Sequence, residues 1–184
     1  MDEGLISRRY AKALFEHAVS IGEETLLYQR MQILEALLRR MPEFRRGLAS
    51  PMISSKTKRE LLINATGKNA ERSYLDFIDL VSANHRTDAL LMIALSYQAH
   101  YRRVKHISVV HLISASSLTN TAIARIKSLA EKKTRGKVEF SNKIDPEIDG
   151  GFIFQINDLR IDASVRGQLE RISRRLAQIN KSII

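Results

Sequence analysis

Histidines and carboxylates are the side chains of this sequence that could bind a metal or act in catalysis, but their spacing supports neither role. The histidines match neither HExxH nor another usual metal spacing: His17, His85, His100, His106 and His111. The absence of cysteine excludes thiolate metal sites and cysteine nucleophiles. The sequence also has no P-loop, GxGxxG or GxSxG motif. We therefore expect no catalytic residues, no metal site and no cofactor.

Basic residues leave one alternative open. There are 30 Lys and Arg against 20 Asp and Glu, a net charge of +10, which suits an anionic partner. The arginine pairs are scattered over expected helices, and no block of five or six like charges occurs. Tyr97 and Tyr101, next to Arg102 and Arg103, could form a base-stacking surface, although a half-buried helical seam is the plainer interpretation. A basic helical nucleic-acid-binding factor is the alternative function.

Residues 1–105 have the pattern of consecutive helices separated by glycine and proline. No apolar run approaches the roughly 18 residues that span a bilayer. The periodicity predicts helices over residues 7–21, 24–41, 42–49, 55–66, 70–83 and 88–105. Ser55 or Thr57 is suited to cap the fourth of them.

The pattern changes after His106, which divides the chain into domains 1–105 and 106–184. The second domain has strand-like runs, a possible tight turn at Asn157–Asp158 and two amphipathic helices, 119–135 and 164–180. The strands are expected over residues 107–115, 137–141, 151–156 and 159–161. The expected fold is α+β: an N-terminal six-helix bundle followed by a small α/β domain with a short sheet and two helices.

Two helices are apolar over most of their circumference. The apolar arcs of helices 7–21 and 70–83 cover about 240° and about 220°. Such helices must be buried on more than one side. Either both lie inside the bundle, or one flank of each forms a groove for a helix of another protein. Residues 89–95 make the sixth helix the better candidate for the centre of the bundle, which would leave the first and fifth free to line a groove.

The last helix has a narrower apolar stripe. The stripe covers about 80°, as is typical of a helix packed on a sheet. It consists of Val165, Leu169, Ile172, Leu176 and Ile179.

Three segments together resemble one family. They are SRRYAKALFEHA (residues 7–18), FIDLVSANHRTDAL (77–90) and KIDPEIDGGFIFQINDLRIDASVRGQLERISRRL (143–176). In this order and spacing they resemble the delta subunit of F-type ATP synthases, which is related to the mitochondrial oligomycin-sensitivity-conferring subunit. The sequence departs from the family pattern at Asp149, usually apolar, and at Ala163, usually glycine.

The resemblance implies a non-catalytic stator subunit, which links the catalytic head to the peripheral stalk and so couples rotation to proton-driven ATP synthesis. Domain 1–105 would bind N-terminal helices of alpha subunits, and domain 106–184 the C-terminal region of b subunits. The head groove would involve Tyr10, Ala13, Leu14, His17, Phe77, Ile78, Val81, Asn84 and Arg86. The stalk surface would involve Phe152, Phe154, Ile156, Ile161, Val165 and Leu169.

The position of the first segment suggests a cellular location. The family motif begins at residue 7, so we expect no transit peptide before it. The resemblance then implies a bacterial enzyme on the cytoplasmic side of the inner membrane, with membrane association through the complex only. It implies no nucleic-acid partner.

Overall fold

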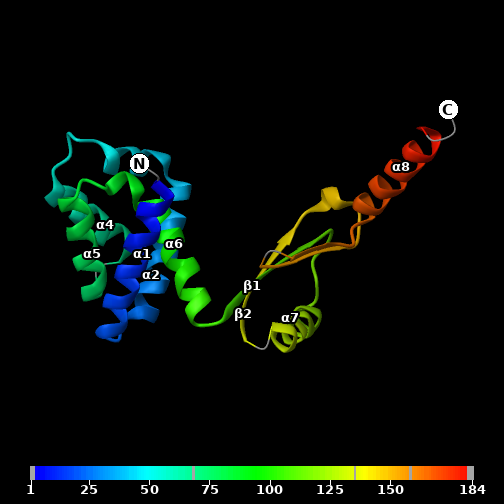
Figure 1. Cartoon of the computed structure of the whole chain (residues 1–184), viewed down its shortest axis with the longest axis horizontal. Coiled ribbons are helices and arrows are strands. Elements are labelled where there is room, and N and C mark those ends of the chain that lie inside the picture. Colours follow the sequence, from blue (N-terminus) through cyan, green and yellow to red (C-terminus); the bar gives the residue numbers. More distant parts are fainter. Residues whose placement is uncertain (1–2, 68, 135, 158, 182–184) are drawn as a thin grey trace. The chain divides into compact units, whose positions relative to one another are not determined.

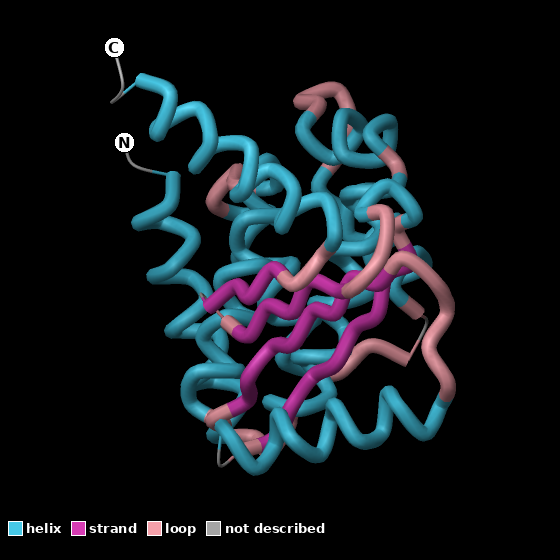
Figure 2. Tube along the Cα trace, turned by 90° about the vertical axis from the view of Figure 1, so that its right-hand side faces the viewer, coloured by secondary structure: helices cyan, strands magenta, loops and turns pink. Residues whose placement is uncertain are grey.

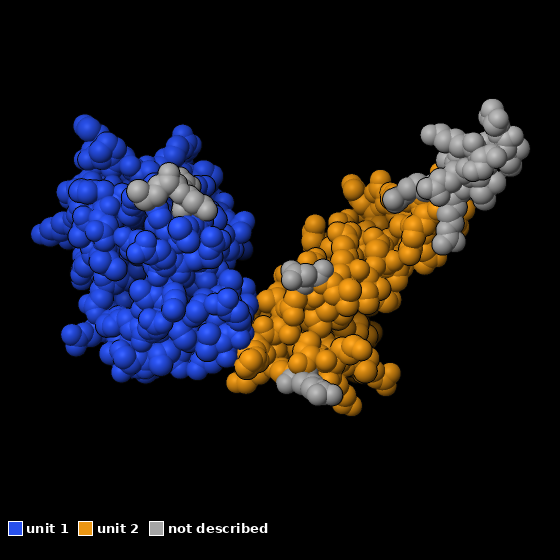
Figure 3. Space-filling view, viewed as in Figure 1, with its two compact units in different colours: residues 1–105 blue, residues 106–184 orange. Residues whose placement is uncertain are grey.

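The protein has two compact units in an α+β fold. The computed structural model describes residues 3–67, 69–134, 136–157 and 159–181, with side chains over residues 4–173 of these ranges. Contacts between Cα atoms divide the chain into Met1–Lys105 (unit 1) and His106–Ile184 (unit 2), coloured separately in Figure 3. Unit 1 is helical, and unit 2 combines helices with one sheet.

Glycine, proline and capping residues delimit the helices of unit 1. Pro42 occupies the first turn of its helix, where its missing N–H leaves no hydrogen bond unmade. The cap of α4 is Ser54, not Ser55 or Thr57, because the Ser54 hydroxyl accepts a hydrogen bond from the Thr57 N–H at 3.1 Å. The helices are α1 (Glu3–Ser20), α2 (Glu24–Arg40), α3 (Pro42–Ala49), α4 (Ser55–Thr66), α5 (Arg72–Ala83) and α6 (Leu90–Val104), the last preceded by the 3-10 turn η1 (Thr87–Ala89).

The core of unit 1 is built around α6, which packs against α1 and α2 (Figure 1). Tyr97 and Tyr101 of α6 are buried there. Tyr101 stacks on Tyr28 with ring centroids 4.2 Å apart, and Phe15 lies against both α6 tyrosines. The alternative of a base-stacking surface at Tyr97 and Tyr101 is therefore wrong, and the favoured helical seam is buried more fully than expected, because both rings are core residues. Burial also raises the pKa of the Tyr97 hydroxyl.

A buried arginine joins α2 to the segment before α5. The Arg30 guanidinium donates from Nε and Nη2 to the two carboxylate oxygens of Glu71, both at 2.9 Å. It also donates to the backbone carbonyls of Thr66, Gly67 and Asn69 and lies 5.6 Å from the ring centroid of Tyr74. Because Glu71 is the N-cap residue of α5, this arginine fixes where α5 begins.

Unit 2 contains a four-stranded sheet in the order β2-β1-β3-β4 (Figure 2). The β1–β2 pair is parallel, and the β1–β3 and β3–β4 pairs are antiparallel. Strand β2 extends to Ile144, beyond the expected end at Ser141, because it pairs with β1 along its full length. The elements are β1 (Ile107–Ser114), α7 (Asn120–Thr134), β2 (Lys137–Ile144), the 3-10 turn η2 (Pro146–Ile148), β3 (Phe152–Ile156), β4 (Leu159–Asp162) and α8 (Val165–Lys181).

The turn between β3 and β4 contains the expected Asn157, whose φ is +48°. Its side-chain carbonyl accepts a hydrogen bond from the Val109 N–H at 3.1 Å, which ties the turn to β1. Asp158 lies outside the described residues. Asparagine tolerates the left-handed conformation better than most residues, which explains its position here.

We predict that replacing Arg30 costs much more stability than replacing an exposed arginine. Arg30→Met leaves the Glu71 carboxylate and three carbonyls without their buried donor, so the free energy of unfolding should fall by about 3–5 kcal/mol. Arg39→Met, which removes an exposed i,i+4 pair with Glu35, should cost about 0.5 kcal/mol. Urea unfolding followed by the helical circular-dichroism signal measures both. Equal losses of unfolding free energy in the two variants would contradict the role of Arg30 as a buried link between α2 and α5.

Candidate functional site

An open groove lies between α1 and the C-terminal end of α5. Its volume is about 420 Å³, and Leu80, 51% exposed, contributes apolar surface from α5. Polar groups from Arg9, Asn84 and Arg86 accompany the apolar ones. The lining residues are Ile6, Arg9, Tyr10, Ala13, Leu80, Asn84 and Arg86. An apolar surface with polar groups beside it fits one side of an amphipathic helix.

Two side chains hold the helices that form the groove. His17 of α1 places Nε2 3.1 Å from Oδ2 of Asp76 on α5. The N-terminus of α5 has no local side-chain cap, and Glu23 from the α1–α2 loop accepts a hydrogen bond from the Ser73 N–H at 2.8 Å instead. This bond lowers the pKa of Glu23 by stabilising its carboxylate form. A negative charge at this position also complements the positive end of the helix dipole.

Four of the expected groove residues line the groove: Tyr10, Ala13, Asn84 and Arg86. His17 is exposed and contacts Asp76. The remaining four are buried in the core, so the expectation that they form open surface is corrected: Leu14, Phe77, Ile78 and Val81. The reason is that α1 packs against α2, α5 and α6, while α5 packs against α1, α2 and α4. Most of each wide apolar arc is used by these contacts.

Sequence reasoning missed three groove residues. Leu80 belongs to the apolar arc of α5 and could have been chosen from it. Ile6 belongs to the apolar arc of α1, which begins at Glu3, and could likewise have been chosen from that arc. Arg9 lies outside the apolar arc of the first helix, so periodicity does not select it for an apolar groove.

A second candidate surface lies on unit 2 and is apolar. Phe152, Ile161, Val165 and Leu169 are exposed, as expected for a docking surface. Phe154 and Ile156 instead pack against the buried cluster of the sheet and α7, so their expected place on the open surface is corrected. The exposed members are extended by Ile144, Leu159 and Ile172.

The strand register explains where this surface lies. Paired residues point to the same face of a sheet, and Ser114 is paired with both Ile144 and Phe152. Phe154 is paired with Ile161 in the next row. The face that carries the core cluster under α7 therefore continues to an uncovered edge, where these apolar side chains are exposed.

Helix α8 does not cover the sheet, contrary to the expectation for its stripe. It packs against η2 and extends away from the strands (Figure 1). Its described stripe residues Val165, Leu169 and Ile172 are exposed, whereas the side chains of Leu176 and Ile179 lie outside the described residues.

The glycine pair sets the start of α8. A Cβ on Gly151, whose φ is +74°, would lie 2.3 Å from the Ala163 carbonyl oxygen, so only glycine fits this close approach of two backbone segments.

The described residues contain neither a cluster of potential metal ligands nor a helix that could span a membrane. No group of three or more His, Asp or Glu side chains among them is arranged to hold a metal ion. In the same part of the chain, every helix is too short or too polar to cross a bilayer.

The comparisons with known proteins agree with one another. Residues 6–176 match the family model described as ATP synthase delta (OSCP) subunit. The chain is similar to the ATP synthase subunit delta of Bacteroides thetaiotaomicron, 39% identical over all of both chains. It is 37% identical to that of Phocaeicola vulgatus, over 98% of each. Its fold is similar to a chain of the Toxoplasma gondii mitochondrial ATP synthase hexamer, with a TM-score of 0.73, 20% identity and 96% and 98% coverage. The expected family is confirmed.

We predict a pH-dependent contribution of Glu23 to stability. Its folded-state pKa is lowered, so its stabilising effect is complete above the ordinary value of 4.5 and is lost as the pH falls through the folded value. Glu23→Gln should therefore be less stable than the parent near neutral pH, and the difference should vanish in acid. Urea midpoints between about pH 7 and about pH 2.5 measure this. Glu60→Gln, on exposed α4 surface, controls for loss of one charge. Parallel curves for parent and Glu23→Gln would contradict the prediction.

Proposed function

The chain belongs to the ATP synthase delta (OSCP) subunit family, and we propose that its unit 1 binds the catalytic head through the α1–α5 groove. As a member of this family it is a non-catalytic stator subunit of F-type ATP synthase, which links the catalytic head to the peripheral stalk. A rotary enzyme makes ATP only if its head is prevented from turning with the rotor. The function of the subunit is therefore to bind and to resist torque.

The observation that carries the head-binding proposal is the groove itself. Helices α1–α6 act in the proposal as one six-helix bundle, with the groove on its surface. The occupant is an N-terminal helix of an alpha subunit, whose apolar side contacts Ile6, Ala13 and Leu80. Its polar side meets Arg9 and Asn84 at the rim. Tyr10 offers both an apolar ring and a hydroxyl to the same helix.

A stator joint must bind its partner tightly, and a preformed groove can provide that affinity. A joint of nanomolar strength needs about −12 kcal/mol. A groove that exists before binding avoids the cost of ordering its own side chains, so more of the energy from apolar burial appears as affinity. His17–Asp76 and Glu23–Ser73 support the proposal because they hold α1 and α5 in place without the partner.

We propose that the C-terminal region of the b subunits binds the apolar surface of unit 2. Its exposed apolar members include Phe152 and Ile161 on the sheet and Val165 and Leu169 on α8. Exposed apolar side chains gathered at one end of a sheet and along one stripe of a helix are typical of an interaction site. Two separate surfaces on two units suit a link between two partners.

The cellular location follows from the complex rather than from this chain. We propose that the subunit is held peripherally on the cytoplasmic side of a bacterial inner membrane. Its bacterial relatives support this placement.

We predict that Leu80→Asp weakens binding of an alpha-subunit N-terminal peptide by at least about tenfold, equivalent to about 1.4 kcal/mol. The introduced carboxylate would be desolvated in the groove without a partner. Leu26→Asp is a matched control, because Leu26 is also 51% exposed and lies on α2 outside the groove. Calorimetric titration of the full chain measures both variants. Equal affinity of Leu80→Asp and the parent would contradict the head-binding site.

We predict that a substitution on the apolar surface of unit 2 weakens binding of the b subunits and leaves binding of the alpha-subunit peptide unchanged. Leu169 is 59% exposed on α8, so Leu169→Asp should fold normally and lose binding of a fragment from the C-terminal region of the b subunits. It should keep the affinity for the alpha-subunit peptide, whereas Leu80→Asp should keep the affinity for the b fragment. Binding of both fragments to each variant gives a crossed comparison. Loss of both activities in either variant would contradict two separate surfaces.

A further inference from the structure

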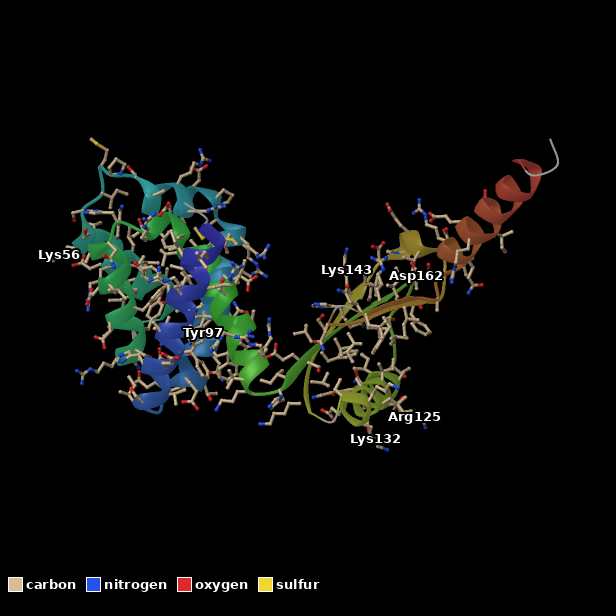
Figure 4. All side chains as sticks on the ribbon, in the orientation of Figure 1. Lys56, Tyr97, Arg125, Lys132, Lys143 and Asp162 are labelled. Carbon is tan, nitrogen blue, oxygen red and sulfur yellow. The ribbon has the colours of Figure 1, made fainter. Side chains whose placement is uncertain are left out.

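Helix α7 has an inner side packed on the sheet and an exposed basic side. Its Ala130 is buried with Val110 and Val138 in the core of unit 2. Figure 4 shows Arg125 and Lys132 of the same helix reaching away from the sheet. We name as the α7 basic face the exposed residues Arg125, Leu129, Lys132 and Lys133.

The spacing of the α7 basic face makes it one continuous stripe. Its members stand at positions i, i+4, i+7 and i+8, which lie on one side of an α-helix. At 1.5 Å per residue the stripe is about 12 Å long, or roughly two turns. This length suits contact with two or three turns of another helix.

The cations of this face have no acidic partner within the described part of the chain. No ion pair is made there by Arg125, Lys132 or Lys133. Some exposed arginines of unit 1, such as Arg39 and Arg46, are paired with glutamates of their own helices, Glu35 and Glu43. The helix dipole favours lysines near the C-terminal end of α7, but it does not account for an arginine in the second turn.

An apolar side chain lies among these cations. Leu129 is 66% exposed, and among the large hydrophobic residues described only Met52 is more exposed. A single exposed leucine is common on protein surfaces. Here, however, a cation lies four positions before it and two cations lie three and four positions after it, so a partner can contact an apolar centre and charged flanks together.

We propose that the α7 basic face binds an acidic amphipathic helix of a neighbouring subunit in the assembled synthase. An apolar side chain of that helix contacts Leu129, and Asp or Glu residues pair with Arg125, Lys132 and Lys133. The proposal rests on the stator function, but not on the α1–α5 groove. Charge complementarity selects an acidic partner. The exposed leucine favours a protein helix over a nucleic acid, whose phosphates would leave it without an apolar contact.

Photo-cross-linking in the purified complex tests the partner. Benzoylphenylalanine replaces Leu129, and mass spectrometry identifies the attached peptide after irradiation. The expected adduct is a segment of another subunit with three or more Asp or Glu residues within two to three helical turns. An adduct to a non-acidic segment, to nucleic acid, to lipid or to this chain alone overturns the proposal, as does no adduct. Co-purification with the large catalytic subunits tests the stator function separately.

Charge exchange tests the contact itself, with the cross-linked segment as a synthetic peptide. Reversing the three cations should weaken its binding to the full chain by at least about tenfold, and replacing its acidic residues by lysine should restore binding. Failure of this exchange overturns the proposal. The variant is Arg125→Glu with Lys132→Glu and Lys133→Glu.

A matched triple reversal controls for net charge. It changes three exposed cations of unit 1: Arg40→Glu, Arg45→Glu and Lys56→Glu. An equal loss of binding in this control overturns the proposal, because the effect would then be one of total charge.

Discussion

The buried ion pair between Arg30 and Glu71 is the constraint on which the α1–α5 groove depends. One guanidinium satisfies a carboxylate and three backbone carbonyls in the segment that leads into α5. A buried pair of this kind contributes little net stability compared with an apolar replacement, but removing one partner is costly. Its value is geometric: it fixes the start of α5, and Glu23 then caps the same helix end. The groove at the far end of α5 inherits its position from these contacts, since a helix moves as a rigid element.

Local signals were sufficient to predict the order of the elements. Pro42 and the glycines delimit helices through backbone geometry, which does not depend on the rest of the fold. The change from helical to alternating patterns after His106 likewise identified where strands begin. Properties that depend on distant partners were less accessible. The length of β2 is set by its pairing with β1, and no residue within β2 indicates that the strand continues to Ile144.

The groove residues illustrate a limit of helical periodicity. The pattern showed that α1 and α5 have apolar surface on several sides, but not which neighbour covers each side. Leu14 and Val81 are as apolar as any groove residue, and they are buried because α1 and α5 pack against each other and against further helices. The surface that these contacts leave open includes Arg9 and Leu80, although periodicity assigns Leu80 to an apolar arc and Arg9 to a polar side. The same limit explains α8, whose stripe of apolar residues has the spacing of a sheet-packing helix and yet is exposed.

Separate docking surfaces have a mechanical consequence for a stator. In the proposed arrangement, with the head on unit 1 and the stalk on unit 2, torque on the head passes through the chain between the two units, so both joints bear the same load in series. The weaker joint then limits the assembly, and stabilising only one of them gains nothing. A third contact at α7 lies on the same unit as Phe152 and Leu169, and with an acidic helix of the stalk it would act in parallel with the stalk joint. Parallel contacts raise the effective concentration of each for the other, so modest individual affinities can hold unit 2 for many turnovers.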